Sequence, residues 1–430
     1  MATLTVGKGM QFATIEGAVA ASHDGDVVLV SAGVYKNDFV TINDSITLES
    51  VGGAATIVAT EPPPNLKGLI LVGDGSHSPD VTINGFVLKG AAIPAKDGGN
   101  GAGIRYQSGN LTLSDDVSEH NQDGILATPI VSDTGTIIVN DSTFASDGSG
   151  AGYTHNLYIG HVAQFVFQDS VSTGAIVGHD IKSRAFDTEI LNSTISDGPT
   201  GTASYEIEIC NGGTALIQGN TIVQGPKSEN PIIISYAQEG DTQPGSLVVT
   251  GNLIENQLTS HPPVGIFNAS TIPAVVSNNE YSGLTAAELL IGPGTLINNI
   301  SLTPAGVTSA ASIAGNEGMT STTSDSISAT GTKPSDVSTN GVNQGLVFIG
   351  GSGTGASASS GAAATSLPSS SPFWVASGDL AGDFVASRND SSAAALNLVP
   401  SNLGGAVFYS SVADGAASPY TAALLDQPRG

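Results

Sequence analysis

The sequence lacks most of the residues that could hold it together by covalent bonds or aromatic packing. It has one cysteine, Cys210, and one tryptophan, Trp374, and aromatic residues make up only 5% of its 430 residues. A single cysteine excludes a disulfide within the chain. Charged residues are also few, at 12%. The fold must therefore be stabilised by the packing of aliphatic side chains and by hydrogen bonds.

Cations are especially scarce. Lys and Arg number 12 against 38 Asp and Glu, which gives a net charge of −26. No basic patch exists that could replace phosphate counterions, so the composition excludes nucleic acid as a partner and disfavours an anionic membrane surface. No run of about 18 apolar residues is present, which argues against membrane insertion. We also find no recognisable signal peptide. The low Lys content and the Ser/Thr/Gly/Asn-rich composition nevertheless favour an extracellular or cell-surface location.

Short apolar runs bounded by Gly, Asn and Asp recur along the first 300 residues, and 55 residues are Gly. Many of these runs alternate apolar and polar residues, as in TIIVN at 136–140, which is typical of strands with one buried face. Several runs end in Asp or Asn at intervals of 23 to 32 residues. These turn residues are Asp141, Asp169, Asn192, Asn220, Asn252 and Asn278. Such a period predicts a repeat array in which each coil stacks on the next, a parallel β-helix.

The chain divides into three parts by composition. Residues 1–305 carry the strand repeat, about ten coils in all, and begin with a helix-like piece around Phe12 and Val19 that we expect to cap the first coil. Residues 306–372 are a Ser/Thr/Gly/Ala-rich connection. Residues 373–430 regain apolar character and predict a small C-terminal β element that serves in docking or assembly.

The chemically unusual residues concentrate between positions 155 and 240. Tyr158, Lys182 and Glu208 follow one another at spacings of 24 and 26 residues. Each comes directly after an apolar residue: Leu157, Ile181 or Ile207. Polar groups that recur at the coil period should lie side by side on neighbouring strands about 4.8 Å apart. Arg184 extends the Lys182 row by one step along the strand.

The same alignment predicts further members of this surface. Asn156, Asp180 and Glu206 would form a second outward column beside the first. His155 and His179 would stand just before their strands, with Tyr205 in the equivalent place of the third coil. The predicted patch thus combines cations, carboxylates, phenols and imidazoles over an area that fits two or three sugar rings.

Two reactions could use such a patch. In a lyase, Lys182 or Tyr158 would remove the proton next to a uronate carboxylate, and Arg184 would neutralise that carboxylate. In an inverting glycoside hydrolase, Asp180 with Glu208, or Glu206 with Glu208, would flank the scissile bond. A simpler interpretation is also open, in which Lys182 belongs to a cross-strand ladder of ion pairs with no catalytic role.

Metal and thiol chemistry have weak support. No spacing predicts a metal site, and we assign no metal ligands. Calcium is the one candidate cofactor, bound between acidic turns, because hard oxygen ligands are plentiful there. The turn residues in question are Asp115, Asp116, Asp141 and Asp147. Cys210 lies in an apolar strand, and we expect it to be buried and not catalytic.

The blocks THNLYIG, GHDIKSRAFDTEILNSTI, SYEIEICNGG and ENPIIISYAQEG resemble a group of bacterial right-handed parallel β-helix repeat proteins of the pectate-lyase-like superfamily. The resemblance covers roughly residues 150–255 and implies a right-handed coil. More distantly, IKSRAFDTEILNSTI resembles the Lys-Ser block of the chondroitinase B and alginate lyase family, in which a Lys is the base and an Arg from a neighbouring coil assists. That implies a base role for Lys182. The expected Arg is replaced by Glu206 and Glu208, so only Arg184 could substitute.

The sequence therefore predicts an extracellular polysaccharide-active β-helix protein, either a lyase or a glycoside hydrolase. The alternative is a non-enzymatic filament, surface-layer or adhesin subunit that forms homo-oligomers or polymers through its C-terminal region. The expected catalytic residues are Lys182, Arg184, Glu206, Glu208, Asp180, Tyr158 and His179. The expected substrate-binding residues are His155, Asn156, Tyr205, Asn211, Tyr236 and Glu239.

Overall fold

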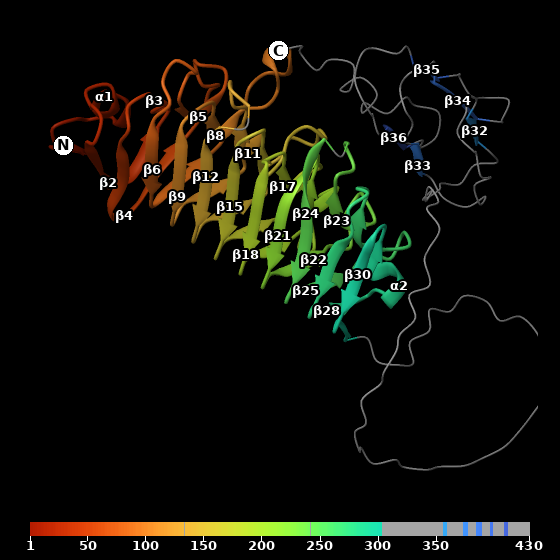
Figure 1. Ribbon diagram of the computed structural model, residues 1–430. Helices are drawn as coiled ribbons and strands as arrows, with labels where there is room; N and C mark the ends of the chain where they lie inside the picture. Colours follow the sequence, from red (N-terminus) through yellow and green to blue (C-terminus); the bar gives the residue numbers. More distant parts are fainter. Residues whose placement is uncertain are drawn as a thin grey trace, which may run out of the picture.

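The fold is taken from a computed structural model (Figure 1). It describes residues 1–302, apart from positions 133 and 241, together with the backbone of five short strands between residues 356 and 411. Strands dominate the described residues. The helical elements are α1 (Ile15–Val19), the 3₁₀ turn η1 (Ala95–Asp97) and α2 (Ala286–Leu289). None of the described helices is long and apolar enough to cross a membrane.

Ten strands stack in parallel as one sheet along the whole solenoid. They are β3 (Val40–Ile42), β5 (Gly68–Val72), β8 (Ala102–Tyr106), β11 (Asp123–Ala127), β14 (Leu157–Ile159), β17 (His179–Ser183), β20 (Tyr205–Ile209), β23 (Ile232–Tyr236), β26 (Val264–Asn268) and β29 (Leu290–Ile291). Each strand pairs with the equivalent strand of the next coil.

A second sheet of 21 strands supplies the other two sides of each coil. One of its two ladders contains β1 (Thr3–Val6), β2 (Val27–Lys36), β4 (Thr47–Val58), β6 (Asp80–Asn84), β9 (Asn110–Ser114), β12 (Thr136–Asn140), β15 (Gln164–Gln168), β18 (Asp187–Leu191), β21 (Gly212–Gln218), β24 (Gln243–Thr250), β27 (Ala274–Ser277) and β30 (Gly294–Ile297). The other contains β7 (Phe86–Lys89), β10 (Val117–Glu119), β13 (Thr143–Ala145), β16 (Val171–Thr173), β19 (Thr194–Ser196), β22 (Thr221–Gln224), β25 (Leu253–Asn256), β28 (Glu280–Ser282) and β31 (Ile300–Ser301). The long strand β4 pairs with β6 and with β7 and so joins the two ladders.

Successive coils of three strands therefore stack from α1 at one end to α2 at the other (Figure 1). This is a right-handed parallel β-helix, as predicted. Helix α1 packs on the first strands and buries Ile15, Ala18 and Val19. Asp38 accepts hydrogen bonds from the backbone N–H groups of Ile15 and Glu16, at 2.7 and 2.9 Å. A carboxylate at a helix N-terminus satisfies donors that have no partner within the helix.

The core of the solenoid is built from rows of aliphatic side chains in register. Leu157, Ile181, Ile207 and Ile234 are successive partners on β14, β17, β20 and β23, and all are fully buried. Each row buries its apolar area against the rows from the other two sides of the coil, and this burial is the main stabilising contribution. In the 21-stranded sheet, buried and partly exposed residues alternate along most strands.

A ladder of short polar side chains runs along one inner corner. Asn220 Nδ2 donates to Asn252 Oδ1 at 3.0 Å, and Asn252 Nδ2 donates to Asn279 Oδ1 at 2.9 Å. On the earlier coils Ser142, Ser170 and Ser193 occupy this position, each accepting a hydrogen bond from the backbone of the preceding coil. The ladder satisfies buried backbone groups at the corner where strands cannot pair.

Two of the six predicted turn residues, Asn220 and Asn252, lie one residue after the turn. Asp141, Asp169, Asn192 and Asn278 do adopt the left-handed conformation, with φ between 48° and 55°. In the two intervening coils Gly219 and Gly251 hold that conformation. Asn220 and Asn252 come one residue later and belong to the ladder. Sequence spacing alone could not separate these adjacent positions because both favour Asn.

Several strands of the ten-stranded sheet are buried on both faces, whereas β3, β8, β14, β26 and β29 include partly or fully exposed residues. All five residues of β11, β17, β20 and β23 are buried. Polar side chains on the outer face of these four strands are therefore shielded from water, which strengthens their mutual electrostatic interactions.

Beyond residue 302 only backbone pairings are described. β32 (Ala356–Ala358), β34 (Phe384–Arg388) and β35 (Leu396–Leu398) form one antiparallel sheet, and β33 (Phe373–Ala376) pairs with β36 (Phe408–Ser411). The predicted connection at 306–372 lies outside the described residues apart from β32. The division into three parts and the role of the C-terminal element stay predictions.

Candidate functional site

Tyr158, Lys182 and Glu208 are direct partners on β14, β17 and β20. The coil alignment made from the sequence predicted this row. Its side chains lie on the outer face of the ten-stranded sheet, because the neighbouring residues Leu157, Ile181 and Ile207 belong to the core. We call the residues gathered here the outer cluster: Tyr158, Lys182, Arg184, Glu208 and Glu239, with His155, His179, Tyr205 and Asn211 around them.

Lys182 lies between two carboxylates. Its Nζ is 2.8 Å from Oε2 of Glu208 and 2.5 Å from Oε1 of Glu239. Glu239 follows β23, so the two carboxylates reach Lys182 from different coils. The Lys182 side chain is 10% exposed and Glu208 only 2%, whereas Glu239 is 31% exposed. The ion pair therefore has a buried side and a side open to solvent.

Arg184 continues the row on the same strand line and contacts three outer-cluster residues. Its Nη2 pairs with the second oxygen of Glu239, and its Nη1 donates to Asn211 Oδ1 at 2.7 Å. Its Nε donates to the Tyr158 hydroxyl at 3.0 Å. The planar guanidinium thus donates to the Tyr158 hydroxyl and to the Glu239 carboxylate at the same time. Arginine can do this because its donors form a rigid planar fork, which lysine lacks.

The two histidines lie beneath this layer. His179 Nε2 is 2.8 Å from Glu208 Oε2, and its Nδ1 is 3.0 Å from Nδ1 of His155. The His155 ring stacks on Tyr158 and the His179 ring on Tyr205, with centroids 5.5 and 4.9 Å apart. Burial, followed by the neighbouring cations, lowers the pKa of both histidines, which are therefore neutral at pH 7.

A lysine that acts as the base of a lyase needs a lowered pKa, but the pKa of Lys182 is raised. Burial alone would lower it, but Cys210, Glu208 and Glu239 raise it well above its usual range. Burial also raises the pKa of the Cys210 thiol, so the thiol is neutral and the effective anions are the two carboxylates. Lys182 thus keeps its proton. Arg184 lowers the Lys182 pKa, but the two carboxylates outweigh this effect and the net pKa is raised.

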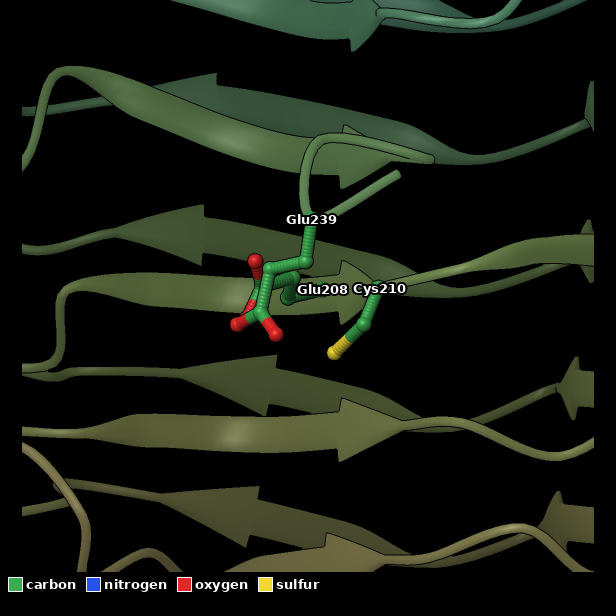
Figure 2. Close-up of side chains that lie close together, drawn as sticks. All are labelled: Glu208, Cys210 and Glu239. Carbon is green, nitrogen blue, oxygen red and sulfur yellow. The ribbon is translucent and has the colours of Figure 1, made fainter. Parts of the chain in front are cut away.

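Glu208, Cys210 and Glu239 lie close together on this face, and Figure 2 shows the Cys210 sulfur beside the two carboxylates. Their ligand atoms all lie within 4.8 Å of one another, the one such group among the described residues. Lys182 and Arg184 already neutralise both carboxylates, however, and the thiol holds its proton. This donor set does not fit a metal ion. Cys210 is fully buried, as expected.

The second predicted column does not lie beside the first. Asn156 Nδ2 donates to Asp180 Oδ1 at 2.8 Å and to Ser172 Oγ at 3.1 Å. Asp180 also accepts from the backbone N–H of Ala175 at 3.2 Å. These contacts lie inside the coil, against β16. The strict alternation fails here because Asp180 and Ile181 both face the interior, so Asn156 and Asp180 are on the opposite side of the sheet from Lys182.

Glu206 is also fully buried in the interior. Its carboxyl oxygens make no side-chain hydrogen bond among the described residues, and the backbone N–H groups of Glu206 and Gly225 only partly offset its burial. Burial, together with Asp197 and Asp180, raises its pKa well above the usual range. Burial likewise raises the pKa of Asp197 to about 6. Asp180, Asp197 and Glu206 form an inner acid cluster, whereas the coil alignment had placed Asp180 and Glu206 on the outer face.

Several predicted roles change with this geometry. Asp180 and Glu206 cannot flank a bond together with Glu208, because the sheet lies between them. Asn156 cannot contact a polysaccharide from inside the coil. Tyr236 belongs to the main hydrophobic core, where its hydroxyl donates to the Gly213 carbonyl oxygen at 2.6 Å. The assignment of Tyr236 to substrate binding is wrong because its side chain lies in the core.

The acidic turns considered for calcium do not converge either. Asp116 accepts from the backbone N–H groups of Phe86 and Ser114, and Asp147 from that of Asn121. Both are buried, while Asp115 and Asp141 occupy left-handed turn positions. Calcium binding stays a prediction without geometric support.

Three residues of the outer face were missed. Arg105 and Asp123 precede residues 155–240, where the unusual residues concentrate. Gln238 accepts a hydrogen bond from the Tyr205 hydroxyl at 3.3 Å. Arg105 could have been found because Lys and Arg are so rare. Asp123 and Gln238 carry no signal in the sequence.

The sequence matches no protein-family model and no curated protein. Similar solved structures include ORF18 of Geobacillus virus E2, with 13% identity and a TM-score of 0.46, covering 67% of this chain and 58% of that one. Another is the alginate lyase from Paenibacillus sp. str. FPU-7, with 12% identity, a TM-score of 0.37, and coverage of 70% and 99%. The pectate lyase Pel9A has 12% identity, a TM-score of 0.37, and coverage of 70% and 78%. The chain thus spans 58% of the length of the viral protein. These likenesses concern the fold and say nothing of activity.

Proposed function

We propose that the outer cluster binds the carboxylate groups of an acidic polysaccharide and that the protein is a uronate-directed polysaccharide lyase. One observation carries the proposal. The carboxylate of Glu239 already lies between Lys182 and Arg184, 2.5 Å from the Lys182 Nζ and paired with the Arg184 guanidinium. The two cations therefore form a receptor of the right size for a carboxylate.

Glu239 is suited to give way to a substrate group. Its side chain is 31% exposed, while the other partner of Lys182, Glu208, is 2% exposed. Glu208 stays fixed on β20, but Glu239 belongs to the turn that follows β23. A uronate carboxylate could replace Glu239 and leave the buried Lys182–Glu208 pair intact. Charge-assisted hydrogen bonds from Lys and Arg are the strongest available for this exchange.

The charges of the cluster disfavour a glycoside hydrolase. That reaction needs one carboxylic acid that keeps a proton at neutral pH. Burial opposes ionisation of Glu208, but Lys182 and His179 hold its pKa well below the usual range, and Lys182 also contributes to a lowered pKa of Glu239. Among the carboxyl groups with raised pKa, Asp180 and Glu206 face the interior, and Asp123, on the outer side, is fully buried. No carboxyl group of the outer cluster is therefore suited to be the acid.

In the proposed lyase reaction Lys182 and Arg184 neutralise the uronate carboxylate, and Tyr158 exchanges the proton. The Tyr158 oxygen, as a phenolate that accepts a hydrogen bond from Arg184 Nε, takes the proton from the carbon next to the carboxylate. The electron pair of that C–H bond forms a carbon–carbon double bond, the bond to the neighbouring glycosidic oxygen breaks, and Tyr158 returns the proton to that oxygen. The Arg184 Nε–Tyr158 contact of 3.0 Å places the phenol beside the carboxylate receptor.

An ultraviolet absorbance assay tests this function. The full-length protein is incubated with pectate, alginate and glycosaminoglycan uronates, and the absorbance of the unsaturated product is followed. We expect activity on at least one polymer, and its loss in Lys182→Ala and Arg184→Ala. Lys89→Ala is the control, because Lys89 pairs with Glu119 on the other sheet. Full activity in both site variants would exclude the proposal.

Assembly is a second candidate function, favoured by the apolar surface at the end of the last coil. Leu296, Ile297, Ile300 and Leu302 are each more than 40% exposed there. An open solenoid end exposes apolar side chains and unpaired backbone groups to a partner chain. Sedimentation of the full chain over a range of concentrations, compared with Ile297→Ser/Ile300→Ser, tests it. A mass that stays monomeric throughout excludes assembly.

A further inference from the structure

Arg105 lies on the same outer face as the outer cluster. Arg105 is the direct strand partner of Leu126 on β11. Leu126 pairs with Tyr158 on β14, and Tyr158 pairs with Lys182 on β17. Three inter-strand steps separate Arg105 from Lys182, roughly 14 Å along the axis of the solenoid. The buried side chain of Leu126 lies between Arg105 and Tyr158. Arg105 thus continues the row of the outer cluster toward the N-terminal end.

Arg105 differs from Arg184 in having no partner. Arg184 contacts Tyr158, Asn211 and Glu239, whereas no ion pair or side-chain hydrogen bond of Arg105 occurs among the described residues. Its Nε is buried. A buried Nε–H group without a hydrogen-bond partner is costly, because it loses contacts with water and gains none in return. An anion bound beside the partly exposed guanidinium would supply the missing contact.

The neighbouring carboxyl group of Asp123 does not satisfy Arg105. Asp123, on the neighbouring strand β11, is fully buried and its Oδ1 accepts from the backbone N–H of His155 at 2.8 Å. Its Oδ2 has no partner among the described residues. Burial raises the pKa of Asp123 well above its usual range, so this carboxyl group interacts with Arg105 only through space and does not neutralise the guanidinium. The donor side of Arg105 is left for a ligand.

The distribution of charge agrees with an anionic ligand. The chain has only 12 Lys and Arg residues and a net charge of −26. Arg105 and Lys182 nevertheless share one row of strand partners on one face, and Arg184 lies two residues from Lys182 on the same face. A repeating polyanion laid along the solenoid axis would meet Lys182 and Arg184 first and Arg105 about three coils further on. Tyr158, between them, interacts electrostatically with both Arg105 and Arg184.

We infer that Arg105 forms a second carboxylate subsite. It binds another uronate residue of the polysaccharide whose reacting sugar is held by Lys182 and Arg184. This inference rests on the proposed function and adds the direction in which the polysaccharide lies: along the outer face of the ten-stranded sheet toward the N-terminal end. It also makes the protein selective for long acidic chains over single sugars.

The test is calorimetric binding of oligogalacturonates and alginate oligosaccharides, from disaccharide to hexasaccharide, by the full chain. We expect Arg105→Gln to weaken hexasaccharide binding about tenfold, the effect of losing one charge-assisted contact, with no change for the disaccharide. Arg105→Lys should be weakened less because it keeps the charge. Methyl-esterified hexasaccharides, which lack the carboxylates, should bind wild type and Arg105→Gln equally. Lys89→Gln, which removes one cation from the other sheet, should behave like wild type.

Three other outcomes are decisive. In the first, Arg105→Gln binds oligosaccharides of every length as tightly as wild type, while Lys182→Ala binds none of them. That result would overturn the second subsite and keep the proposed function. Absence of binding by any oligosaccharide to wild type would overturn the proposed function and the subsite with it. A uniform loss at every length in both Arg105 variants, accompanied by a lower melting temperature, would show that Arg105 has a structural role and would also overturn the subsite.

Discussion

Nζ of Lys182 lies 2.8 Å from Oε2 of Glu208, its direct partner on the next strand, and the Glu208 side chain is only 2% exposed. Buried ion pairs add little stability compared with apolar residues of the same shape, but the loss of one partner leaves a charge that the interior cannot solvate. Removal of one member of the Lys182–Glu208 pair should therefore destabilise these coils.

Lys182→Met should lower the free energy of unfolding by about 3–5 kcal/mol, because Glu208 is left without its cation. Urea denaturation followed by circular dichroism measures the change. Lys89→Met is the matched control, since the Lys89 side chain is 40% exposed in its pair with Glu119 and such pairs contribute about 1 kcal/mol or less. Adding Glu208→Gln to Lys182→Met should recover part of the loss. Equal effects of the two lysine variants would contradict the buried pair.

Asn252 is the central member of the amide ladder. Its side chain donates to the Ile217 carbonyl oxygen and to Asn279 Oδ1, both at 2.9 Å, and accepts from Asn220. Asn252→Ala leaves several buried groups without partners and should cost about 2–3 kcal/mol or more. Thermal unfolding tests this against Gln218→Ala on the exposed side of the preceding coil. Similar melting temperatures for both variants would exclude the ladder as a stabilising element.

Asp147 provides a pH-dependent prediction. Burial raises its pKa to about 8, despite hydrogen bonds from Asn121 and Ser118. Because the folded-state pKa lies above the unfolded value of 3.8, the folded state binds the proton more tightly. The stabilising contribution is complete below the unfolded pKa and is lost as the pH rises through about 8.

Asp147→Asn cannot ionise and should therefore lose less stability than wild type as the pH rises from about 6 to about 9. Melting temperatures across this range measure the difference. Asp141→Asn, which changes an exposed turn carboxyl, is the control and should follow the wild-type curve. A parallel decline of wild type and Asp147→Asn would show that Asp147 does not titrate in this window.

The fold could be predicted from the sequence because its causes are local and repeated. Apolar residues such as Leu157, Ile181 and Ile207 recur at the coil period, and turn residues mark each corner. The same regularity predicted the row of Tyr158, Lys182 and Glu208. Each of these residues directly follows a core residue, and strand alternation then determines its side.

The rest of the site depends on contacts that no period encodes. The alternation breaks at Asp180, which faces inward together with Ile181, so the carboxylates expected outside lie in the core. Glu239 reaches Lys182 from a turn in another coil, a contact set by the path of that turn. The pKa of Lys182 then follows from its two carboxylates, and this could not be known before Glu239 was placed.

The most direct test of the account concerns Glu239 as the internal occupant of a carboxylate receptor. Isothermal titration of alginate and polygalacturonate into wild type and Glu239→Gln compares their affinities, with Lys182→Ala/Arg184→Ala as the variant that lacks the receptor. Removal of the competing internal carboxylate should make Glu239→Gln bind a uronate polymer about tenfold more tightly than wild type, and the receptor-less variant should not bind. Weaker binding by Glu239→Gln than by wild type would show that Glu239 itself contacts the sugar, and would contradict the account.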